Sequence, residues 1–271
     1  MPEVETVVRG LRKTIIGRRI IDVKIKPTAQ IFPDKKEFSK IIKGAVFEKA
    51  ERRGKNILLG LDNDFTLWVH LKMTGHFYYL PSSEPVGKHD HVVFELENDG
   101  HNLRFNDYRR FGRLRLFPSL DLWKQPGLAD LGPEPLDMSA DDFVNLVRSR
   151  RRMIKPALMD QTFIAGLGNI YADESLFLSR LHPMRLTDSI SRAKLRELFG
   201  HIQCLFSKSI RMMGTSVDTF AGVNAQPGKF QNYLQVYGRD GESCVHCGAV
   251  IKRQKIGSRS AHFCPRCQRV K

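Results

Sequence analysis

The first strong pattern along the chain is an amphipathic helix near the N-terminus. Residues 3–16 carry apolar side chains at helical spacing, namely Val4, Val7, Val8, Leu11 and Ile15. Positions separated by three, four and seven residues fall on one face of an α-helix. The pattern therefore predicts a helix over 3–16 with one buried face.

Short runs rich in β-branched and aromatic residues follow this helix. Turn signals separate them, such as the triplets at 62–64 and 98–100. The strands expected from these runs are 19–25, 45–52, 56–61, 65–71, 76–80, 91–96, 102–106 and 113–117. Many short strands of this kind predict an antiparallel sandwich or barrel.

Helical patterns dominate the second half of the chain, after a Pro- and Gly-containing segment that we interpret as a linker. The expected helices are 140–150, 155–160, 169–179 and 191–213, with a loop at 215–229. We therefore expect an α+β chain with a β-sandwich flanked by helices (1–126), a hinge (127–138), a helical domain (139–230) and a C-terminal finger (231–271).

The finger is predicted from the spacing of four cysteines. Cys244 and Cys247 form one C-x2-C pair, Cys264 and Cys267 form another, and sixteen residues separate the pairs. Two such pairs joined by a hairpin supply the four soft ligands of a tetrahedral zinc ion. The remaining cysteine, Cys204, lies in a helical pattern and is expected to be a buried thiol. The alternative is a structural zinc ribbon whose charge has no function.

Charge indicates the class of partner. The chain has 44 Lys and Arg against 29 Asp and Glu, a net charge of +15. From residue 244 to the C-terminus there are seven basic residues and no acidic one. A basic chain of this kind binds polyanions, which favours nucleic acid, although charge alone names no reaction. No apolar run is long enough to span a bilayer and no signal peptide opens the chain, so we expect a cytoplasmic protein with no membrane partner.

The N-terminus carries a second candidate chemistry. Met1 precedes Pro2 and Glu3, and removal of Met1 would make Pro2 a terminal secondary amine. Such an amine can attack an electrophilic sugar carbon and form an iminium, with Glu3 beside it as acid or base. The simpler interpretation is that Pro2 only starts a helix.

Several short strings carry a resemblance that favours the catalytic interpretation. They are PEVET (2–6), GK (54–55), HLKMTG (70–75), FNDYRRFG (105–112), AGLGNIYADE (165–174), VYGR (236–239) and GSRSAHFCPRCQ (257–268). With the cysteine finger, they resemble the bacterial formamidopyrimidine-DNA glycosylase family from the first residues to the last.

The resemblance implies a bifunctional enzyme of base-excision repair. Family members remove oxidised purines, such as 8-oxoguanine and formamidopyrimidines, from duplex DNA and then cut the strand at the abasic site by β,δ-elimination. Pro2 would be the nucleophile and Glu3 the acid/base, with Lys55 and Arg259 completing the catalytic set. The implied partner is double-stranded DNA that contains oxidised bases or abasic sites, bound by a monomer with one structural zinc.

The resemblance also implies DNA contacts. Met73, Arg109 and Phe111 match the side chains that fill the space left by an extruded base, although Met73 and Phe111 could instead be core residues. Asn169 opens a helix after a Gly-rich turn and matches a phosphate-binding residue of the helix-two-turn-helix. Arg259 matches a second phosphate-binding residue, in the finger. Lys155 is expected to join this backbone-contact surface. The DNA is expected in a basic cleft between the two halves.

Two departures from the family pattern bear on function. The family usually begins Met-Pro-Glu-Leu-Pro-Glu-Val-Glu-Thr, so three residues are absent before Val4. Either Pro2-Glu3 aligns with the second Pro-Glu pair of the family and the true terminus lies upstream, or the chain is short by design. In the 215–225 loop, Asp218-Thr219 replaces a typical Arg-Asp pair. The alternatives are an endonuclease VIII-like enzyme for oxidised pyrimidines, a catalytically silent DNA-binding homologue, and a zinc-ribbon RNA-binding or ribosomal factor.

Overall fold

The computed structural model describes residues 1–98, 100–216, 223 and 227–270. It divides into two compact units. The sandwich unit comprises Pro2–Ala129 and Met212–Lys229, and the helical unit comprises Asp130–Arg211 and Phe230–Lys271, with Met1. Most of the loop expected at 215–229, including Asp218 and Thr219, lies outside the described residues.

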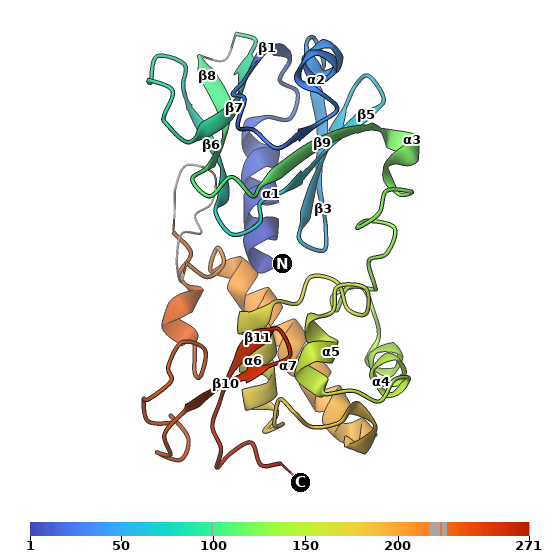
Figure 1. Cartoon of the computed structure of the whole chain (residues 1–271), viewed down its shortest axis with the longest axis vertical. Coiled ribbons are helices and arrows are strands. Elements are labelled where there is room, and N and C mark those ends of the chain that lie inside the picture. Colours follow the sequence, from blue (N-terminus) through green and yellow to red (C-terminus); the bar gives the residue numbers. More distant parts are fainter. Residues whose placement is uncertain (99, 217–222, 224–226, 271) are drawn as a thin grey trace. The chain divides into compact units, whose positions relative to one another are not determined.

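The sandwich unit contains two sheets and three helices (Figure 1). One sheet has the order β1-β7-β8-β6 and is antiparallel; the other has the order β2-β9-β5-β4-β3. The bounds are α1 (Pro2–Thr14), β1 (Ile20–Ile25), β2 (Ile31–Phe32), α2 (Lys35–Ile42), β3 (Phe47–Arg53), β4 (Asn56–Leu61), β5 (Phe65–His70), β6 (Gly75–Pro81), β7 (Asp90–Leu96), β8 (His101–Asp107), β9 (Arg113–Pro118) and α3 (Ser119–Leu122). The predicted β-sandwich flanked by helices is confirmed.

One apolar core holds this unit together. The buried face of α1, formed by Val4, Val7, Val8 and Leu11, belongs to the same cluster as the inward side chains of both sheets. Strand β9 shows the alternation that creates such a core: Leu114 and Leu116 are buried, whereas Arg113 and Arg115 point to the other face.

Helix α2 was not predicted from the sequence, although its signals are present. Asp34 caps it by accepting hydrogen bonds from the backbone N–H groups of Lys36 and Glu37. Phe38 and Ile42, four residues apart, form its buried face. An N-cap followed by this spacing is a usable helix signal.

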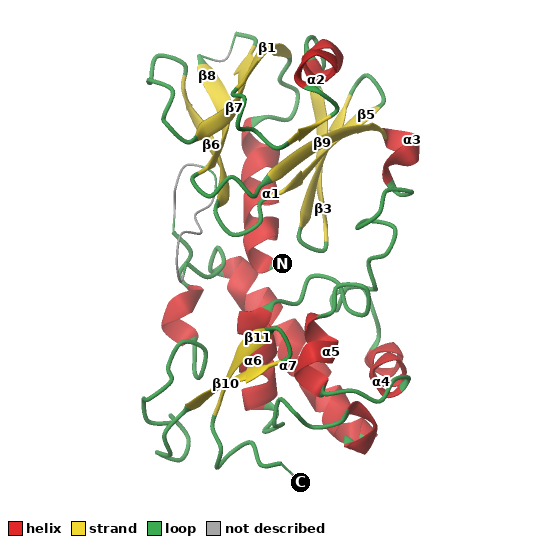
Figure 2. Ribbon diagram, in the orientation of Figure 1, coloured by secondary structure: helices red, strands yellow, loops and turns green. Residues whose placement is uncertain are grey.

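The helical unit contains four α-helices and a β-hairpin among its described residues (Figure 2). The bounds are α4 (Ala140–Arg148), α5 (Ile154–Met159), α6 (Asn169–Leu178), α7 (Arg192–Arg211), β10 (Lys252–Ile256) and β11 (Arg259–Phe263), with 3-10 turns η1 (Thr187–Ser189) and η2 (Phe230–Tyr233). The predicted helices are confirmed within a few residues.

The expectation for Cys204 is wrong, because this residue is exposed. Helix α7 buries Leu198, Ile202, Leu205 and Phe206. Cys204 follows Ile202 by two positions, roughly 200° around the helix, so its side chain points away from that face.

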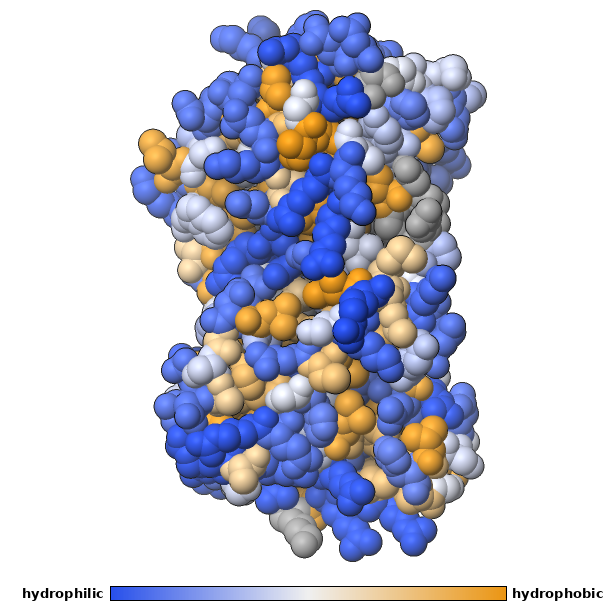
Figure 3. Space-filling model, turned by 180° about the vertical axis from the view of Figure 1, so that it is seen from behind, coloured by the Kyte–Doolittle hydropathy of each residue, from blue (hydrophilic) through white to orange (hydrophobic). Residues whose placement is uncertain are grey.

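The face drawn in Figure 3 is covered mostly by hydrophilic residues, with hydrophobic ones in small separate patches. Within the described parts of the chain, no helix combines the length and apolar character that crossing a bilayer requires.

Candidate DNA-lesion site and zinc finger

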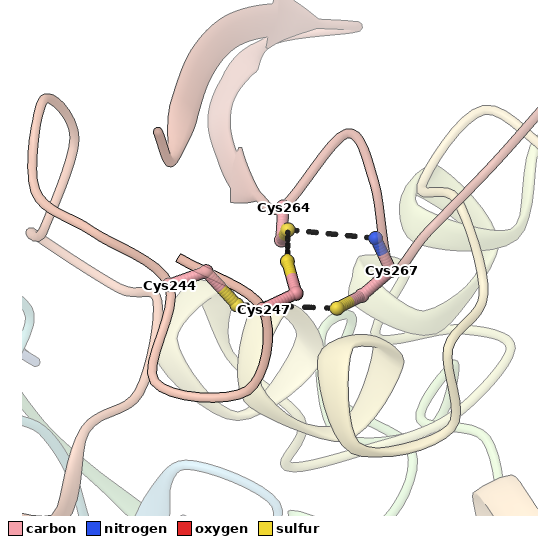
Figure 4. A group of neighbouring side chains, drawn as sticks. All are labelled: Cys244, Cys247, Cys264 and Cys267. Atoms are coloured by element: carbon pink, nitrogen blue, oxygen red, sulfur yellow. Dashed lines mark hydrogen bonds between the residues drawn. The ribbon is translucent and has the colours of Figure 1, made fainter. Parts of the chain in front are cut away.

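The four finger cysteines converge on one point (Figure 4). Their sulfur atoms all lie within 4.8 Å of one another, with Cys244–Cys267 at 3.9 Å and Cys247–Cys264 at 3.5 Å between Sγ atoms. Four thiolates around a zinc ion, each about 2.3 Å from it, stand about 3.8 Å apart. The donor set and its spacing therefore fit a single tetrahedral zinc.

Two buried carboxylates of α6 tie the finger region to the helical unit. Glu174 accepts hydrogen bonds from the backbone N–H groups of Gln235, Val236 and Tyr237, at 2.9–3.0 Å. Burial raises the pKa of Glu174, and these three N–H groups oppose the shift. The neighbouring Asp173 accepts a hydrogen bond from the backbone N–H of His262 at 2.9 Å. Asp173 and Glu174 thus hold the chain before the first cysteine pair and again directly before the second.

Lys155 completes this connection and is not on the surface where a DNA contact was expected. Its side chain is fully buried on α5, its Nζ lies 2.6 Å from Asp173 Oδ1, and the same ammonium donates to the Ser260 carbonyl at 2.6 Å. Burial lowers the pKa of Lys155, while Asp173 opposes that shift. In this structure Lys155 holds β11 next to Arg259 instead of presenting its charge to solvent.

Asn169 stands at the start of α6, as the Gly-rich turn predicted. Gly166 has a φ of 91°, which favours glycine, and Gly168 occupies the cap position without a side-chain cap. Among the described atoms, the buried Oδ1 of Asn169 has no hydrogen-bond partner. The first N–H groups of a helix suit an anion, whereas the Oδ1 of Asn169 is an acceptor and can take a hydrogen bond from a bound water.

Pro2 is the first residue of α1, and its ring is buried. Glu3 is partly buried, and its Oε1 accepts a hydrogen bond from the Thr215 backbone N–H at 3.2 Å. That bond links the start of α1 to the segment that leads into the 215–229 loop. The backbone that holds Glu3 is therefore close in sequence to Asp218-Thr219, where the chain departs from the family pattern.

Lys55 lies at the tip of the β3–β4 hairpin, directly after Gly54 with its φ of 58°. Arg52 connects this tip to the first turn of α1, because it pairs with Glu5 at 3.1 Å and donates to the Gly54 carbonyl at 3.1 Å. The hairpin and the helix start are thus fixed to each other by partly buried polar contacts.

Met73, Arg109 and Phe111 are brought to adjacent turns of the β6–β8 sheet edge. Met73 is 62% exposed and Phe111 is 54% exposed, so neither is a core residue. The guanidinium of Arg109 lies 5.1 Å from the centre of the Phe111 ring. Two protruding apolar side chains and a cation therefore share one small surface.

Asp107 holds the turns that carry Met73 and Phe111, and it was not identified from the sequence as a site residue. Its carboxylate is buried and accepts hydrogen bonds from the Thr74 hydroxyl, the Arg109 N–H at 3.2 Å and the Gly112 N–H at 2.7 Å. Glycine is required at 112, since a Cβ there would lie 2.5 Å from the Phe105 ring. An aspartate between a strand and a Gly-containing turn is the signal that could have identified it.

His70 was also missed, although it lies in the HLKMTG string. Burial, followed by the charges of Lys72, Lys55 and Arg113, lowers the pKa of His70 to about 4. Its Nδ1 accepts a hydrogen bond from the Lys72 N–H at 2.9 Å, so a neutral ring carries its proton on Nε2. His70 can therefore donate to an anion among the surrounding cations.

Three models of protein families match the chain along its length. The N-terminal domain of formamidopyrimidine-DNA glycosylase matches residues 1–114, the H2TH domain of the same enzyme matches 131–221, and the zinc finger found in FPG and IleRS matches 241–270. Curated relatives agree over full length: formamidopyrimidine-DNA glycosylase of Pelotomaculum thermopropionicum is 42% identical over 100% of this chain and 99% of its own.

The chain belongs to the formamidopyrimidine-DNA glycosylase family.

The formamidopyrimidine-DNA glycosylase of Heliobacterium modesticaldum is 43% identical over 99% of both chains. Among solved structures, a point mutant of Lactococcus lactis FPG, in complex with DNA containing Fapy-dG, has a TM-score of 0.93 and 35% identity, covering 100% of this chain and 99% of that one. A complex of Lactococcus lactis Fpg with DNA containing an abasic site has a TM-score of 0.92, also at 35% identity, and covers the same shares of the two chains.

These findings confirm the predicted family and one structural zinc ion. The H2TH match includes α4, α5, α6 and α7, which confirms the helix-two-turn-helix expectation for the fold. The roles of individual residues remain predictions.

Proposed function

We propose that this chain is a bifunctional DNA glycosylase and abasic-site lyase that excises oxidised purines from duplex DNA. The observation that carries the proposal is the surface formed by Met73, Arg109 and Phe111, which Asp107 holds on two adjacent turns. Relatives of the same length and fold are in complex with DNA containing Fapy-dG or an abasic site, which supports the same substrate class here.

Base removal requires the damaged nucleotide to leave the stack, and the space that it leaves must be filled. Phe111 and Met73 are exposed and apolar, so they can enter that space and offset the loss of stacking. Arg109 carries a guanidinium that can donate hydrogen bonds to the base opposite the lesion.

The chemical step begins with Pro2, once removal of Met1 exposes its amine. The Pro2 nitrogen attacks C1′ of the extruded nucleotide, the N-glycosidic bond breaks, and the base leaves with a proton. Loss of the amine proton and opening of the sugar ring give an iminium between Pro2 and C1′. Glu3 would move protons between the amine, the sugar oxygen and C2′.

Strand cleavage follows from the same iminium. Removal of a C2′ proton expels the 3′ phosphate, and a second elimination expels the 5′ phosphate. Lys55 lies on the hairpin that Arg52 ties to the start of α1, so it is proposed to bind the lesion strand and assist these proton transfers.

The duplex is held through its phosphates. Asn169 and Arg259 are proposed to bind backbone phosphates, the first from the start of α6 and the second from the finger hairpin. The zinc ion, held by the four cysteines, stabilises the fold of that hairpin. Lys155 is proposed to position Arg259 through Ser260 instead of touching DNA.

A lesion panel tests the proposal. Duplexes containing 8-oxoguanine, a formamidopyrimidine or thymine glycol are incubated with the enzyme, and base release and strand cleavage are measured separately. Release of the purine lesions with little release of thymine glycol supports the proposal; the opposite ranking supports an endonuclease VIII-like enzyme.

The second candidate is a DNA-binding homologue without lyase activity. Pro2 begins α1 with its ring buried, as expected of a proline that only starts a helix, and this favours the candidate. Tight binding to an abasic-site duplex without base release or strand cleavage would establish this candidate.

A further inference from the structure

The outer face of the five-stranded sheet carries a cluster of cations that the proposed chemistry does not use. Arg113 and Arg115 stand on the face of β9 opposite the core, and β9 pairs with β5 so that Arg113 lies opposite His70 and Arg115 opposite Trp68. Directly paired residues of antiparallel strands share a face. Lys72 follows β5 by two residues and adds a third full charge.

Among the described residues, no acidic side chain forms an ion pair with Lys72, Arg113 or Arg115. Partial burial, then the charges of Arg113 and Arg115, lower the pKa of Lys72; partial burial, then Arg113, lowers the pKa of Arg115. A cluster that repels itself in this way is stabilised by a bound anion.

A cavity of about 460 Å³ opens beside these arginines, within the sandwich unit. Its lining includes Arg113, Arg115, Phe32 and the amides Gln30 and Gln125. The volume lies within the roughly 300–1,000 Å³ typical of small-molecule sites. The cavity is therefore large enough for one nucleotide.

An exposed aromatic ring borders the cations. Phe32, on the edge strand β2, is 50% exposed and stacks on Phe117 with 5.1 Å between ring centres. The guanidinium of Arg115 lies 5.1 Å from the Trp68 ring centre, so that charge is already oriented by an aromatic partner. Cations interleaved with aromatic rings are typical of surfaces that bind single-stranded nucleic acid.

We propose that this cavity binds an unpaired nucleotide of the DNA substrate, with its phosphate on Arg113 and Arg115 and its base against Phe32. The proposal rests on the proposed function, because it assumes that DNA is the substrate. A nucleotide of the DNA is favoured over a free nucleotide because β9 begins two residues after Phe111. A DNA strand bound at the Phe111 turn can therefore continue along β9. The enzyme would then bind lesions near single-stranded segments better than lesions in blunt duplex.

The test compares a blunt abasic-site duplex with the same duplex carrying a single-stranded overhang, at several salt concentrations. The wild-type chain is expected to bind the overhang substrate more tightly. The variant R113Q/R115Q is expected to lose this preference and to reduce the slope of log affinity against log salt by about 0.7, the contribution of one single-strand phosphate contact. Phe32→Ala is expected to weaken overhang binding by about fivefold or more.

The matched control is K24Q/K43Q, which also removes two positive charges, from exposed lysines paired with Glu95 and Asp22. It is expected to keep the overhang preference. Trp68 emission, measured in a Trp123→Phe background, gives an independent readout because a bound phosphate would draw Arg115 away from the Trp68 ring.

Each outcome decides the proposal. Equal affinity of the wild-type chain for blunt and overhang duplexes, or equal losses in R113Q/R115Q and K24Q/K43Q, would overturn it. Displacement of the overhang by deoxyadenosine monophosphate supports the site, whereas binding of that nucleotide without any overhang preference would assign the cavity to a free nucleotide and overturn the strand proposal. Base release from blunt 8-oxoguanine duplex is measured in parallel, so failure of the proposed function is recognised separately.

Discussion

Substitution of Lys155 by methionine should destabilise the helical unit and release the finger hairpin. Methionine keeps most of the side-chain volume but removes the ammonium that lies 2.6 Å from Asp173 and donates to Ser260. Both side chains of the ion pair are 1% exposed, so Asp173 would remain as an unpaired buried charge. Breaking one partner of a buried pair typically costs about 3–5 kcal/mol, and we expect a loss of that size.

Urea unfolding of the full chain, with zinc release to a chelator as a second readout, measures this effect. Lys194→Met is the matched control, since Lys194 forms an exposed i,i+3 pair with Glu197 on α7. Exposed pairs of this kind contribute roughly 0–1 kcal/mol, so the control should unfold almost as the wild-type chain does. K155M/D173N should recover part of the loss because it removes the unpaired charge as well.

The same variant separates a positioning role from direct DNA contact. A lysine that binds a phosphate directly would, when replaced, reduce the salt dependence of DNA binding and leave the free energy of unfolding unchanged. The positioning role of Lys155 is refuted if Lys155→Met unfolds within about 1 kcal/mol of the wild-type chain, retains zinc and shows only that reduced salt dependence.

Three further predictions concern the finger, the two turns and pH. Cys244→Ser should lower bound zinc from one to none per chain by mass spectrometry of metals and weaken DNA binding, whereas the exposed Cys204→Ser should do neither; full binding without zinc contradicts the finger's role. Asp107→Ala should lose at least ~2 kcal/mol in urea unfolding, because three donors lose a buried acceptor, and should weaken binding to abasic duplex more than to undamaged duplex; equal weakening would exclude a role in lesion recognition. The pKa of His70 is lowered from 6.5 to about 4, so between these pH values the unfolded chain binds a proton that the folded chain does not. The free energy of unfolding should therefore be highest above about pH 6.5 and fall as the pH falls toward 4. His70→Asn should flatten this pH dependence, and an unchanged profile would contradict the reasoning.

Elements with strong local signals could be predicted from the sequence. Helix α1 has an uninterrupted apolar face, and most strands of the sandwich are bounded by turn residues. Hydrophobic periodicity and turn residues were therefore enough to locate them. The cysteine pairs predicted a zinc site, because ligand type and spacing are nearly sufficient to identify one. Helix α2 is short, and its cap and two apolar positions did not stand out between neighbouring strands.

Side-chain partners could not be predicted in the same way. Lys155 and Asp173 are 18 positions apart, and nothing local to Lys155 indicates that it is buried rather than solvated. Asp107 acts through turns that converge only after β6 and β8 pair, and Cys204 depends on which face of α7 is covered. Contacts of this kind are set by tertiary packing, which hydrophobic periodicity does not specify.

The central claim is that Pro2 forms the covalent link to the damaged nucleotide. Sodium borohydride is added to the enzyme and an 8-oxoguanine duplex, and the trapped complex is digested and analysed by mass spectrometry. The account predicts a chain that lacks Met1, with the deoxyribose adduct on the peptide beginning at Pro2. A chain that retains Met1, an adduct on Lys55 or another lysine, or no adduct despite DNA binding would contradict it.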